Sequence, residues 1–211
     1  MKEYLYLAFV FSVLAIGQSQ AQVDQGDWLV RIRALDIQPR NQSDPIPALG
    51  VPANAITLNN KWAPEIDLSY FFLKNIAVEL ILTYPQRHDV SLNGAKIGTA
   101  KHLPPTLTVQ YHFIPDGKFR PYLGAGINYY THFSDVNLSV PGVGQLDMGR
   151  NSWGGAPQAG FDVEVGKNKF INFDVKKIYI GSDVKLAANG ATVSHVRLDP
   201  VVFGVGFGWK F

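Results

Sequence analysis

The feature that most constrains the fold of this chain is a strict alternation of large apolar residues with small or polar ones. The alternation is clearest at the C-terminus, where one face carries Val201, Phe203, Val205, Phe207, Trp209 and Phe211. The opposite face is mostly glycine, at Gly204, Gly206 and Gly208. A period of two residues predicts a β-strand. A glycine-rich face suits a crowded interior in which backbones and side chains approach closely.

Seven further segments alternate in the same way: 28–33, 65–72, 76–84, 106–113, 122–129, 158–165 and 171–176. Lys177 breaks the last pattern, which indicates a bulge or a position at the rim of the sheet. No stripe with a helical period is present, and no segment after the N-terminal one is apolar for ten residues in a row. The chain is therefore expected to be all-β, with eight strands and no transmembrane helix.

The connections between these strands alternate in length. Short turns occupy 73–75, 114–118 and 166–169, and long loops occupy about 38–62, 85–104, 134–154 and 181–196. An even number of strands, with short turns at one end and long loops at the other, is typical of outer-membrane barrels. We therefore predict an eight-stranded antiparallel transmembrane β-barrel with short periplasmic turns and long extracellular loops. The alternative, a secreted soluble sandwich or lipocalin-like barrel, does not explain why every strand has about ten residues.

The N-terminus reads as a targeting segment. After Lys2, residues 4–17 form an apolar run, which is shorter than the roughly 20 residues that a membrane-spanning helix needs. Ser19 and Ala21 place small residues at the −3 and −1 positions of a cleavage site. We expect a signal peptide over 1–21, rather than an uncleaved anchor, and an outer-membrane barrel over 22–211. Export without any cysteine fits a bacterial envelope, so the expected location is the cell outer membrane.

Composition argues against several classes of function. A net charge of +2 is too weak to indicate a nucleic-acid partner, and the absence of cysteine excludes thiolate metal sites and cysteine nucleophiles. No spacing typical of metal ligands joins the five histidines, His88, His102, His112, His132 and His195. Ser194 and His195 are adjacent, which does not by itself make a nucleophile–base pair. We therefore expect no enzyme activity, no catalytic residues, no metal and no cofactor.

The faces expected to point into the barrel carry charges of both signs, at Arg31, Arg33, Glu65, Asp67, Glu79, Asp162, Glu164, Asp174, Lys176 and Lys210. A barrel of eight strands is only wide enough for side chains to fill, which excludes a wide aqueous pore. Unpaired charges in such an interior cost several kcal/mol each. We expect a structural plug of ion pairs and hydrogen bonds in the periplasmic half.

The loop half of the barrel is predicted to be apolar inside. Leu35, Ile81 and Tyr130 point inward there, and the adjoining loops carry Trp62, Leu103, Leu138, Val140, Val143, Leu146, Met148 and Trp153. An apolar mouth beneath apolar loops is a candidate site for a hydrophobic ligand. The alternative, which the residues leave open, is a small apolar core that only orders the loops.

Six stretches carry a more specific signal: KWAPEIDLSYFF (61–72), NIAVELILTYPQRHDV (75–90), KHLPPTLTVQYHF (101–113), KFRPYLGAGINYYTHF (118–133), NSWGGAPQAGFDVEV (151–165) and VRLDPVVFGVGFGWKF (196–211). Together they resemble the OmpW family of small outer-membrane proteins, which includes the AlkL-type alkane-uptake proteins. The resemblance implies a narrow hydrophobic channel that small apolar molecules enter between the loops. They would leave sideways into the membrane through a gap in the wall, because the periplasmic half is plugged.

The resemblance also implies roles for individual positions. Ile81 and Trp153 match the channel lining of the family, with Leu35, Trp62 and Leu103 as further lining candidates. The terminal Phe211 resembles the signal that the barrel-assembly machinery reads. Three prolines at strand starts on the loop side, Pro104, Pro105 and Pro157, donate no ladder hydrogen bond and are candidates for a lateral opening.

Three functions compete at this stage. The first is passive uptake of small hydrophobic solutes, with outer-membrane lipid, lipopolysaccharide and the barrel-assembly machinery as the other partners. The second is a non-transporting structural or stress-response barrel or a surface receptor. The third is a lipid-modifying enzyme, which needs a histidine paired with a serine or an acid at the rim.

Overall fold

A computed structural model describes residues 22–47, 50–103, 105–132, 138–140, 144–148 and 151–211, and these residues are almost all in β-strands. The expected signal peptide, residues 1–21, lies outside the described residues. Among the residues described, none belongs to a helix long and apolar enough to cross a membrane.

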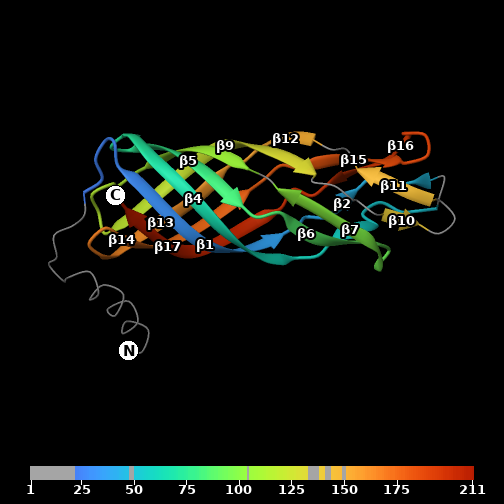
Figure 1. Cartoon of the computed structure of the whole chain (residues 1–211), viewed down its shortest axis with the longest axis horizontal. Coiled ribbons are helices and arrows are strands. Elements are labelled where there is room, and N and C mark those ends of the chain that lie inside the picture. Colours follow the sequence, from blue (N-terminus) through green and yellow to red (C-terminus); the bar gives the residue numbers. More distant parts are fainter. Residues whose placement is uncertain (1–21, 48–49, 104, 133–137, 141–143, 149–150) are drawn as a thin grey trace, which may run out of the picture.

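Eight long strands form a closed antiparallel barrel, as predicted. They are β1 (Trp28–Gln38), β4 (Lys61–Leu73), β5 (Ile76–Thr83), β8 (Thr106–His112), β9 (Phe119–His132), β13 (Gln158–Gly166), β14 (Lys169–Lys177) and β17 (Val201–Lys210). Their order around the wall is β13-β14-β17-β1-β4-β5-β8-β9, and pairing of β13 with β9 closes it. Figure 1 shows these strands tilted across one end of an elongated molecule.

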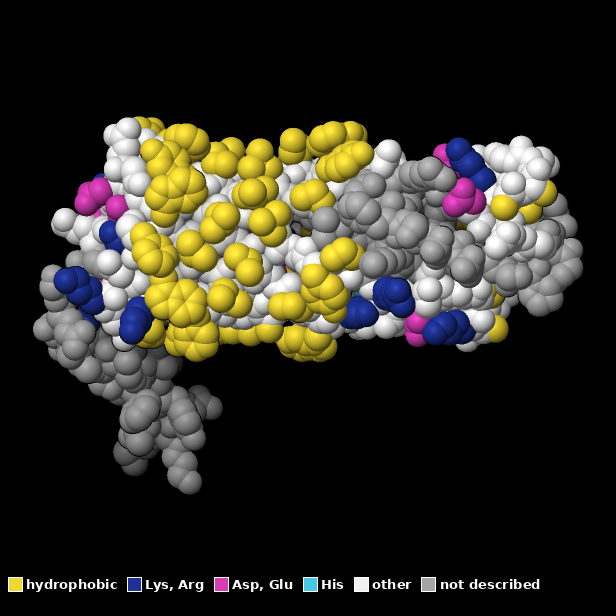
Figure 2. Space-filling view, in the orientation of Figure 1, with side chains coloured by type: hydrophobic (Ala, Val, Ile, Leu, Met, Phe, Trp, Pro, Cys, Tyr) yellow, Lys and Arg dark blue, Asp and Glu magenta, His cyan; other side chains and the backbone are white. Residues whose placement is uncertain are grey.

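The register puts the predicted faces on the predicted sides. Arg31 lies opposite Asp67 on β4 and opposite Gly208 on β17, so charged side chains and glycines share the interior. The large apolar residues of the same strands are exposed on the outer surface, among them Ile32, Ile66, Phe173 and Phe207. Figure 2 shows them as a continuous yellow band around the visible face of the barrel, with Lys, Arg, Asp and Glu beyond its two ends. Such a band is the surface that a barrel presents to lipid.

The long loops contain strands of their own, which the sequence analysis did not predict. They are β2 (Gln42–Ser43), β3 (Ile56–Leu58), β6 (Gln86–Leu92), β7 (Ala95–Leu103), β10 (Leu138–Val140), β11 (Gly144–Met148), β12 (Asn151–Gly155), β15 (Gly181–Leu186) and β16 (Thr192–Arg197). Strands β10, β11, β15, β16 and β2 form a second sheet, whereas β7 and β12 pair with β9 and prolong the barrel wall. Figure 1 shows them as an extension beyond one end of the barrel.

An apolar core fills this extension and continues into the upper barrel. Its fully buried members are Leu35, Ile56, Leu58, Val90, Leu146, Ile178, Ile180, Val184, Val196, Leu198 and Val202. Leu35 and Val202 belong to barrel strands, and Val90 and Val196 belong to loop strands. The loops are therefore packed onto the mouth of the barrel rather than standing free of it.

Candidate functional site

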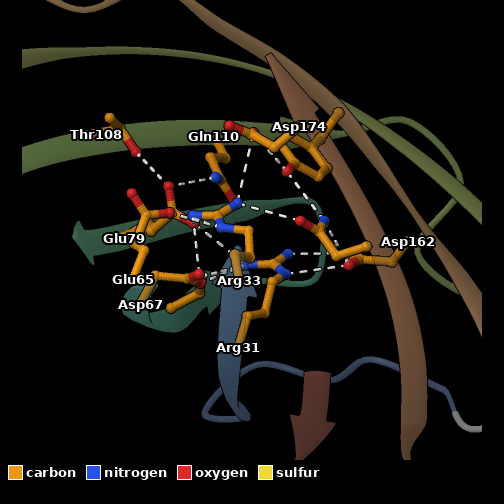
Figure 3. A network of polar contacts seen from close by, with 12 residues as sticks. Arg31, Arg33, Glu65, Asp67, Glu79, Thr108, Gln110, Asp162 and Asp174 are labelled. Atoms are coloured by element: carbon orange, nitrogen blue, oxygen red, sulfur yellow. Dashed lines mark hydrogen bonds and ion pairs between the residues drawn. The ribbon is translucent and has the colours of Figure 1, made fainter. Parts of the chain in front are cut away.

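A layer of buried ion pairs crosses the middle of the barrel interior, centred on two arginines of β1. The Arg31 guanidinium donates Nε to Asp162 Oδ1 at 3.0 Å and Nη2 to Asp162 Oδ2 at 2.8 Å, a bidentate arrangement. Its Nη1 donates to Asp67 Oδ1 at 3.1 Å and to the Ser69 hydroxyl at 2.9 Å. Arg31 thereby joins β1 to β4 on one side and to β13 across the interior (Figure 3).

Arg33 lies two residues further along β1 and points to the same interior. Its Nε donates to Glu65 Oε1 at 2.7 Å, and its Nη2 lies 2.8 Å from Asp67 Oδ2 and 3.2 Å from Glu79 Oε1. The ammonium of Lys176 donates to both oxygens of Glu65, at 3.0 and 3.1 Å. All these side chains are at most 3% exposed, so water does not screen the pairs.

Neutral side chains complete the layer. Gln158 Nε2 donates to Glu79 Oε2 at 3.0 Å and to Asp174 Oδ2 at 2.7 Å, and the Tyr122 hydroxyl donates to the same Asp174 oxygen at 2.8 Å. Gln110 Nε2 donates to Glu79 Oε2 at 2.8 Å. Figure 3 shows Glu79, Gln110 and Asp174 pointing from different strands toward one network. The layer fills the middle of the barrel interior with paired groups, whereas the sequence predicts a plug of ion pairs in the periplasmic half.

Glycines of β17 make room for the arginines. A Cβ at Gly206 would lie 2.0 Å from the carbonyl oxygen of Ile32 and 2.8 Å from Cγ of Arg33. Only a residue without a side chain fits there. The glycine face seen in the sequence is thus the inner surface against which the β1 arginines pack.

Below the polar layer, a second apolar cluster closes the periplasmic end, which the sequence analysis had assigned to charge alone. It consists of Val23, Leu29, Phe71, Ala77 and Phe170, all nearly fully buried. Two ion pairs border this end: Arg120 Nη2 lies 3.0 Å from Glu164 Oε2, and Lys210 Nζ lies 2.7 Å from Asp27 Oδ2. The periplasmic half therefore combines the expected charges with an apolar closure contributed partly by the segment that precedes β1.

Above the polar layer, an enclosed cavity of about 40 Å³ occupies the upper barrel. Apolar side chains form most of its wall, and two of the predicted lining residues, Leu35 and Ile81, are among them at 2% exposure each. Glu65 and Lys176 form a polar floor, and Thr83 and Thr106 contribute hydroxyls. These four polar residues were not predicted as lining. The alternation alone places Glu65, Thr83, Thr106 and Lys176 on inward faces, so the signal was present.

The other predicted lining residues do not join this cavity. The side chains of Trp62 and Trp153 are 66% and 69% exposed. The Trp153 ring lies 4.7 Å from the ring of Tyr129, its cross-strand partner on β9. Both tryptophans lie on the outer surface, in the aromatic band near the loop end of the barrel. Leu103 ends β7 opposite Thr131 of β9, and its side chain lies outside the described part of the structure.

The hydrogen-bonded wall is interrupted beside the cavity. Pairing of β5 with β8 runs from Ile76–Tyr111 to Ile81–Thr106 and goes no further among the described residues. Pairing resumes only between β6 and β7, at Gln86–His102. Among the described residues, 82–85 lie on one side of this gap in the pairing and Leu103 and Pro105 on the other; Pro85 and Pro105 have no N–H to donate. Pro104, a predicted opening residue, belongs to the same segment but lies outside the described residues.

Pro157 stands in a different setting. Its carbonyl accepts a 3.0 Å hydrogen bond from the Lys177 amide, and the neighbouring Ala156 exchanges two backbone hydrogen bonds with Gly126 of β9, at 2.9 and 3.1 Å. The wall is therefore continuous on both sides of Pro157. Of the two prolines that the structure describes, Pro105 lies where the described β5–β8 pairing has ended, and Pro157 does not.

Two of the five histidines, His102 and His132, are cross-strand partners at the β7–β9 pairing, and the other three lie apart. His112 lies inside the barrel beside Phe71 and Tyr122, with ring centroids 4.9 and 5.1 Å away, whereas His195 Nδ1 lies 2.9 Å from Asp183 Oδ1 in the loop sheet. His88 Nδ1 contacts the Asn59 carbonyl at 3.0 Å. Among the residues that the structure describes, no three His, Asp or Glu side chains are grouped as metal ligands.

Comparison with known proteins places this geometry in a wider context. The family model described as "OmpW family" matches residues 24–211. The chain is 39% identical over 188 residues to the outer-membrane protein y4mB of Sinorhizobium fredii, covering 87% of this chain and 80% of that protein. It is 32% identical to outer membrane protein W of Vibrio cholerae, with 89% of each chain covered.

A solved structure supports the same assignment. The crystal structure of the outer membrane protein OprG from Pseudomonas aeruginosa superposes with a TM-score of 0.77 and 28% identity, over 91% of this chain and 99% of that one. The match extends over the barrel and the loop extension together. By its sequence, its closed eight-stranded barrel and its relatives, the chain is an outer-membrane protein that belongs to the OmpW family.

Proposed function

We propose that this protein is a passive channel for small hydrophobic molecules, which enter between the extracellular loops and leave sideways into the membrane. The observation that carries the proposal is the position of the cavity. It lies above a layer of paired charges that crosses the barrel, and beside the interruption of the wall between β5 and β8. A molecule in the cavity would therefore have the ion-pair layer beneath it and the end of the described β5–β8 pairing beside it.

The floor excludes passage to the periplasm through the barrel. An apolar molecule that crossed it would have to separate Arg31 from Asp162 and Arg33 from Glu65, whose donor–acceptor distances are 2.7–3.0 Å. Each charge left buried without its partner costs several kcal/mol. Sideways movement avoids this cost.

The wall offers the sideways route. Ile81 and Thr83 of β5 and Thr106 of β8 line the cavity, and the ladder between the two strands stops at the Ile81–Thr106 pair. We therefore propose that the lateral opening lies beyond this pair, between residues 82–85 on one side and Leu103 and Pro105 on the other.

The cavity volume sets a condition on transport. About 40 Å³ is close to the share of one water molecule in the liquid, about 30 Å³, and is too small for a medium-chain alkane. The apolar core that joins the loops to the barrel, including Ile178, Ile180 and Val202, has to move apart during uptake. Apolar side chains can do so without leaving a polar group unpaired.

The same core supports the second candidate, a structural barrel or surface receptor without transport. Eleven fully buried apolar residues order the loops whether or not a solute passes. The two candidates differ in what happens at the interruption of the wall, which only the channel uses.

Uptake of a medium-chain alkane by cells with and without the protein tests the proposal. Faster uptake is expected with the protein, and Ile81→Asp, which adds a charge to the cavity wall, is expected to abolish it. Ile81→Val keeps the wall apolar and is the matched control, with equal folded amounts verified in the membrane. Unchanged uptake of alkanes, aromatics and fatty acids would leave the structural or receptor barrel as the better account.

The lateral route has its own test, because the chain contains no cysteine of its own. Leu82→Cys with Pro105→Cys, bridged by a bifunctional thiol reagent, joins the two sides of the interruption and is expected to stop uptake. Ala159→Cys with Val175→Cys, a directly paired position in the continuous wall, is the control and should leave uptake intact. Equal inhibition by both bridges would count against a lateral opening between β5 and β8.

Two further roles follow from the termini. We propose that residues 1–21 are removed as a signal peptide, which N-terminal sequencing of the membrane protein checks. We propose also that Phe211 is read by the barrel-assembly machinery. Its side chain is exposed and its amide donates to the Trp28 carbonyl at 2.8 Å, so it ends the seam between β17 and β1. Phe211→Ala is expected to lower the assembled amount in cells without lowering the stability of refolded protein.

A further inference from the structure

The outer surface of the barrel carries a hollow over five neighbouring strands. Two adjoining grooves, of about 640 and 620 Å³, share Ala34, Trp62 and Val205. The first groove follows two neighbouring rows of the ladder, which run from β13 across β14 and β17 to β1 and β4. Its aromatic edges are Phe161, Phe173 and Phe203.

Ala34 is the reason for the hollow. Along the outward face of β1 it follows Ile32, and its ladder neighbours are Val205 on β17 and Pro64 on β4. A methyl group among larger apolar side chains leaves a depression in a surface that otherwise projects rings and branched chains. A linear apolar chain that lies in such a depression makes more van der Waals contacts than it would on a flat surface.

Cations border the extracellular end of this hollow. Lys177 is the next outward residue beyond Val175 on β14, and two residues along a strand correspond to about 7 Å. Arg40 is exposed and lies close enough to Lys177 for their charges to interact. Lys61 precedes the groove residue Trp62, and its ammonium donates to the carbonyl of Arg87, itself an exposed cation, at 2.6 Å.

Fewer carboxylates face the same region. Asp36 lines the first groove and accepts a hydrogen bond from Gln38 Nε2 at 2.6 Å, and Asp199 accepts one from the Ile180 amide at 3.0 Å. Lys177 also donates to the Asp199 carbonyl oxygen, which leaves two of its ammonium protons for another acceptor. Asp89 also lies near Lys61, but it pairs with Lys96 at 2.7 Å, so cations outnumber carboxylates at this end of the hollow.

We propose that this hollow is a specific binding site for a phosphorylated lipid of the outer leaflet. One acyl chain lies over Ala34 between Phe173 and Phe203, and the headgroup phosphate is held by Lys177 and Arg40. The site combines an apolar groove at membrane depth with positive charge at its extracellular end, which complements a lipid with an anionic head and long chains. This proposal does not depend on transport and uses a different side of the wall from the interruption between β5 and β8.

The chain offers a matched control for the groove. A shallower hollow of about 330 Å³ surrounds Ala125 on β9, bordered by Val109, Tyr111 and Leu123, and no Lys or Arg is among its lining residues. Ala34→Phe and Ala125→Phe therefore each fill an outer hollow with the same side chain. They differ in the next outward residues toward the loop end, which are Leu107 and Ile127 beside Ala125 but include Lys177 beside the first hollow.

Native mass spectrometry of the full-length mature protein in non-ionic detergent measures the binding. The probes are bisphosphorylated lipid A and the same lipid after removal of both phosphates. We expect a preference of about 30-fold for the phosphorylated form, the amount that two nearby cations supply. Arg40→Gln with Lys177→Gln should remove that preference, and Ala34→Phe should weaken the binding of both lipids.

Controls separate the site from general attraction. Lys96→Gln with Lys185→Gln removes the same charge from the loop extension, and Ala125→Phe fills the other hollow, so both should bind as the unaltered protein does. Equal binding of the two lipids overturns the proposal, as does an equal effect of either variant and its control. Complete displacement of the lipid by inorganic phosphate would show a free-phosphate site and would also overturn it.

Discussion

The middle and the top of the barrel interior are built on opposite principles. In the middle, Arg31 and Arg33 each contact several carboxylates at 2.7–3.3 Å from two or more strands. At the top, the side chains of Leu35, Ile178 and Val202 pack with loop residues through apolar contact. The ion-pair layer is fixed in place because each buried charge needs a partner at hydrogen-bond distance. The apolar core is stabilised by the burial of apolar surface and can rearrange, because one apolar contact can replace another.

The difference shows how a barrel of only eight strands can be closed and still admit a solute. Rearranging the middle layer leaves charges unpaired in a dry interior. Rearranging the top exposes apolar area, at about 25 cal/mol per Å², and an apolar solute can cover that area again. The predictions below each alter one side of this comparison.

Arg31→Met is expected to have the largest effect. It removes the arginine paired with Asp162 and one of the two paired with Asp67, while both carboxylates stay buried, which costs about 3–5 kcal/mol. Urea unfolding in lipid vesicles measures the loss. Lys74→Met, which breaks the exposed pair with Asp116, is the control and should change stability by less than about 1 kcal/mol. A similar loss in both variants would mean that the polar layer is not what holds the barrel.

Ile180→Ala tests the apolar region. Truncating this 3% exposed side chain in the core that joins loops and barrel is expected to cost about 3 kcal/mol. The loss should be confined to the extension, since no barrel ion pair involves Ile180. Hydrogen exchange is expected to accelerate in β15 and β16 and to stay unchanged in β1 and β4. Uniform acceleration through the barrel would show that the two regions unfold together.

Gly206→Ala and Gly208→Ala compare two positions on the same glycine face. A Cβ at Gly206 meets backbone at 2.0 Å, whereas one at Gly208 comes no closer than 3.2 Å, to Cγ of Arg31. The first variant is expected to lose about 1–3 kcal/mol through overpacking and the second clearly less. Urea titrations of the two variants measure the free energy of unfolding. Equal losses of stability would mean that the barrel wall adjusts freely around the arginines.

The smallest expected effect concerns pH and the loop hairpin β6–β7. Burial lowers the pKa of His88, against the opposing effect of its hydrogen bond to the Asn59 carbonyl, with Lys61 and Asp89 as the neighbouring charges. In the unfolded hairpin, His88 binds a proton with the ordinary histidine pKa of about 6.5, which is higher than its pKa in the folded protein. Stability contributed by neutral His88 is therefore present above that pH and lost as the pH falls below it. Hydrogen exchange of β6 at several pH values measures this, with His88→Gln expected to flatten the profile.

Much of the barrel could be predicted from the sequence because a period of two residues encodes the side of the wall. The same rule placed Arg31, Asp67 and Ile81 inside. The same rule, extended to Trp62 and Trp153, puts both on the outward face, whereas the family resemblance suggested that they line the channel. Both residues lie on the outer surface. Long-range geometry such as the interruption beyond Ile81–Thr106 depends on which strands pair, and no local pattern reports that.

The strands of the loop extension were detectable in part. Asn93 and Gly94, both with positive φ, form the turn between β6 and β7, and Asn189 and Gly190 lie between β15 and β16. An Asn-Gly pair flanked by alternating residues is a strong hairpin signal. The pairing of β11 with β15, or of β16 with β2, joins segments far apart in the chain and carries no such signal.

The arrangement of the polar layer has a consequence for the order in which the chain assembles. Arg31 and Arg33 find Glu65, Asp67 and Glu79 within about fifty residues, whereas Asp162 and Asn172 arrive more than a hundred residues later. The glycine face of β17, the last strand, then closes over the arginines. Contacts of such sequence separation form late, since the intervening chain must first lose its freedom. The interior charges can therefore stay hydrated until the final strand docks, and closure of the barrel and drying of its centre become a single event.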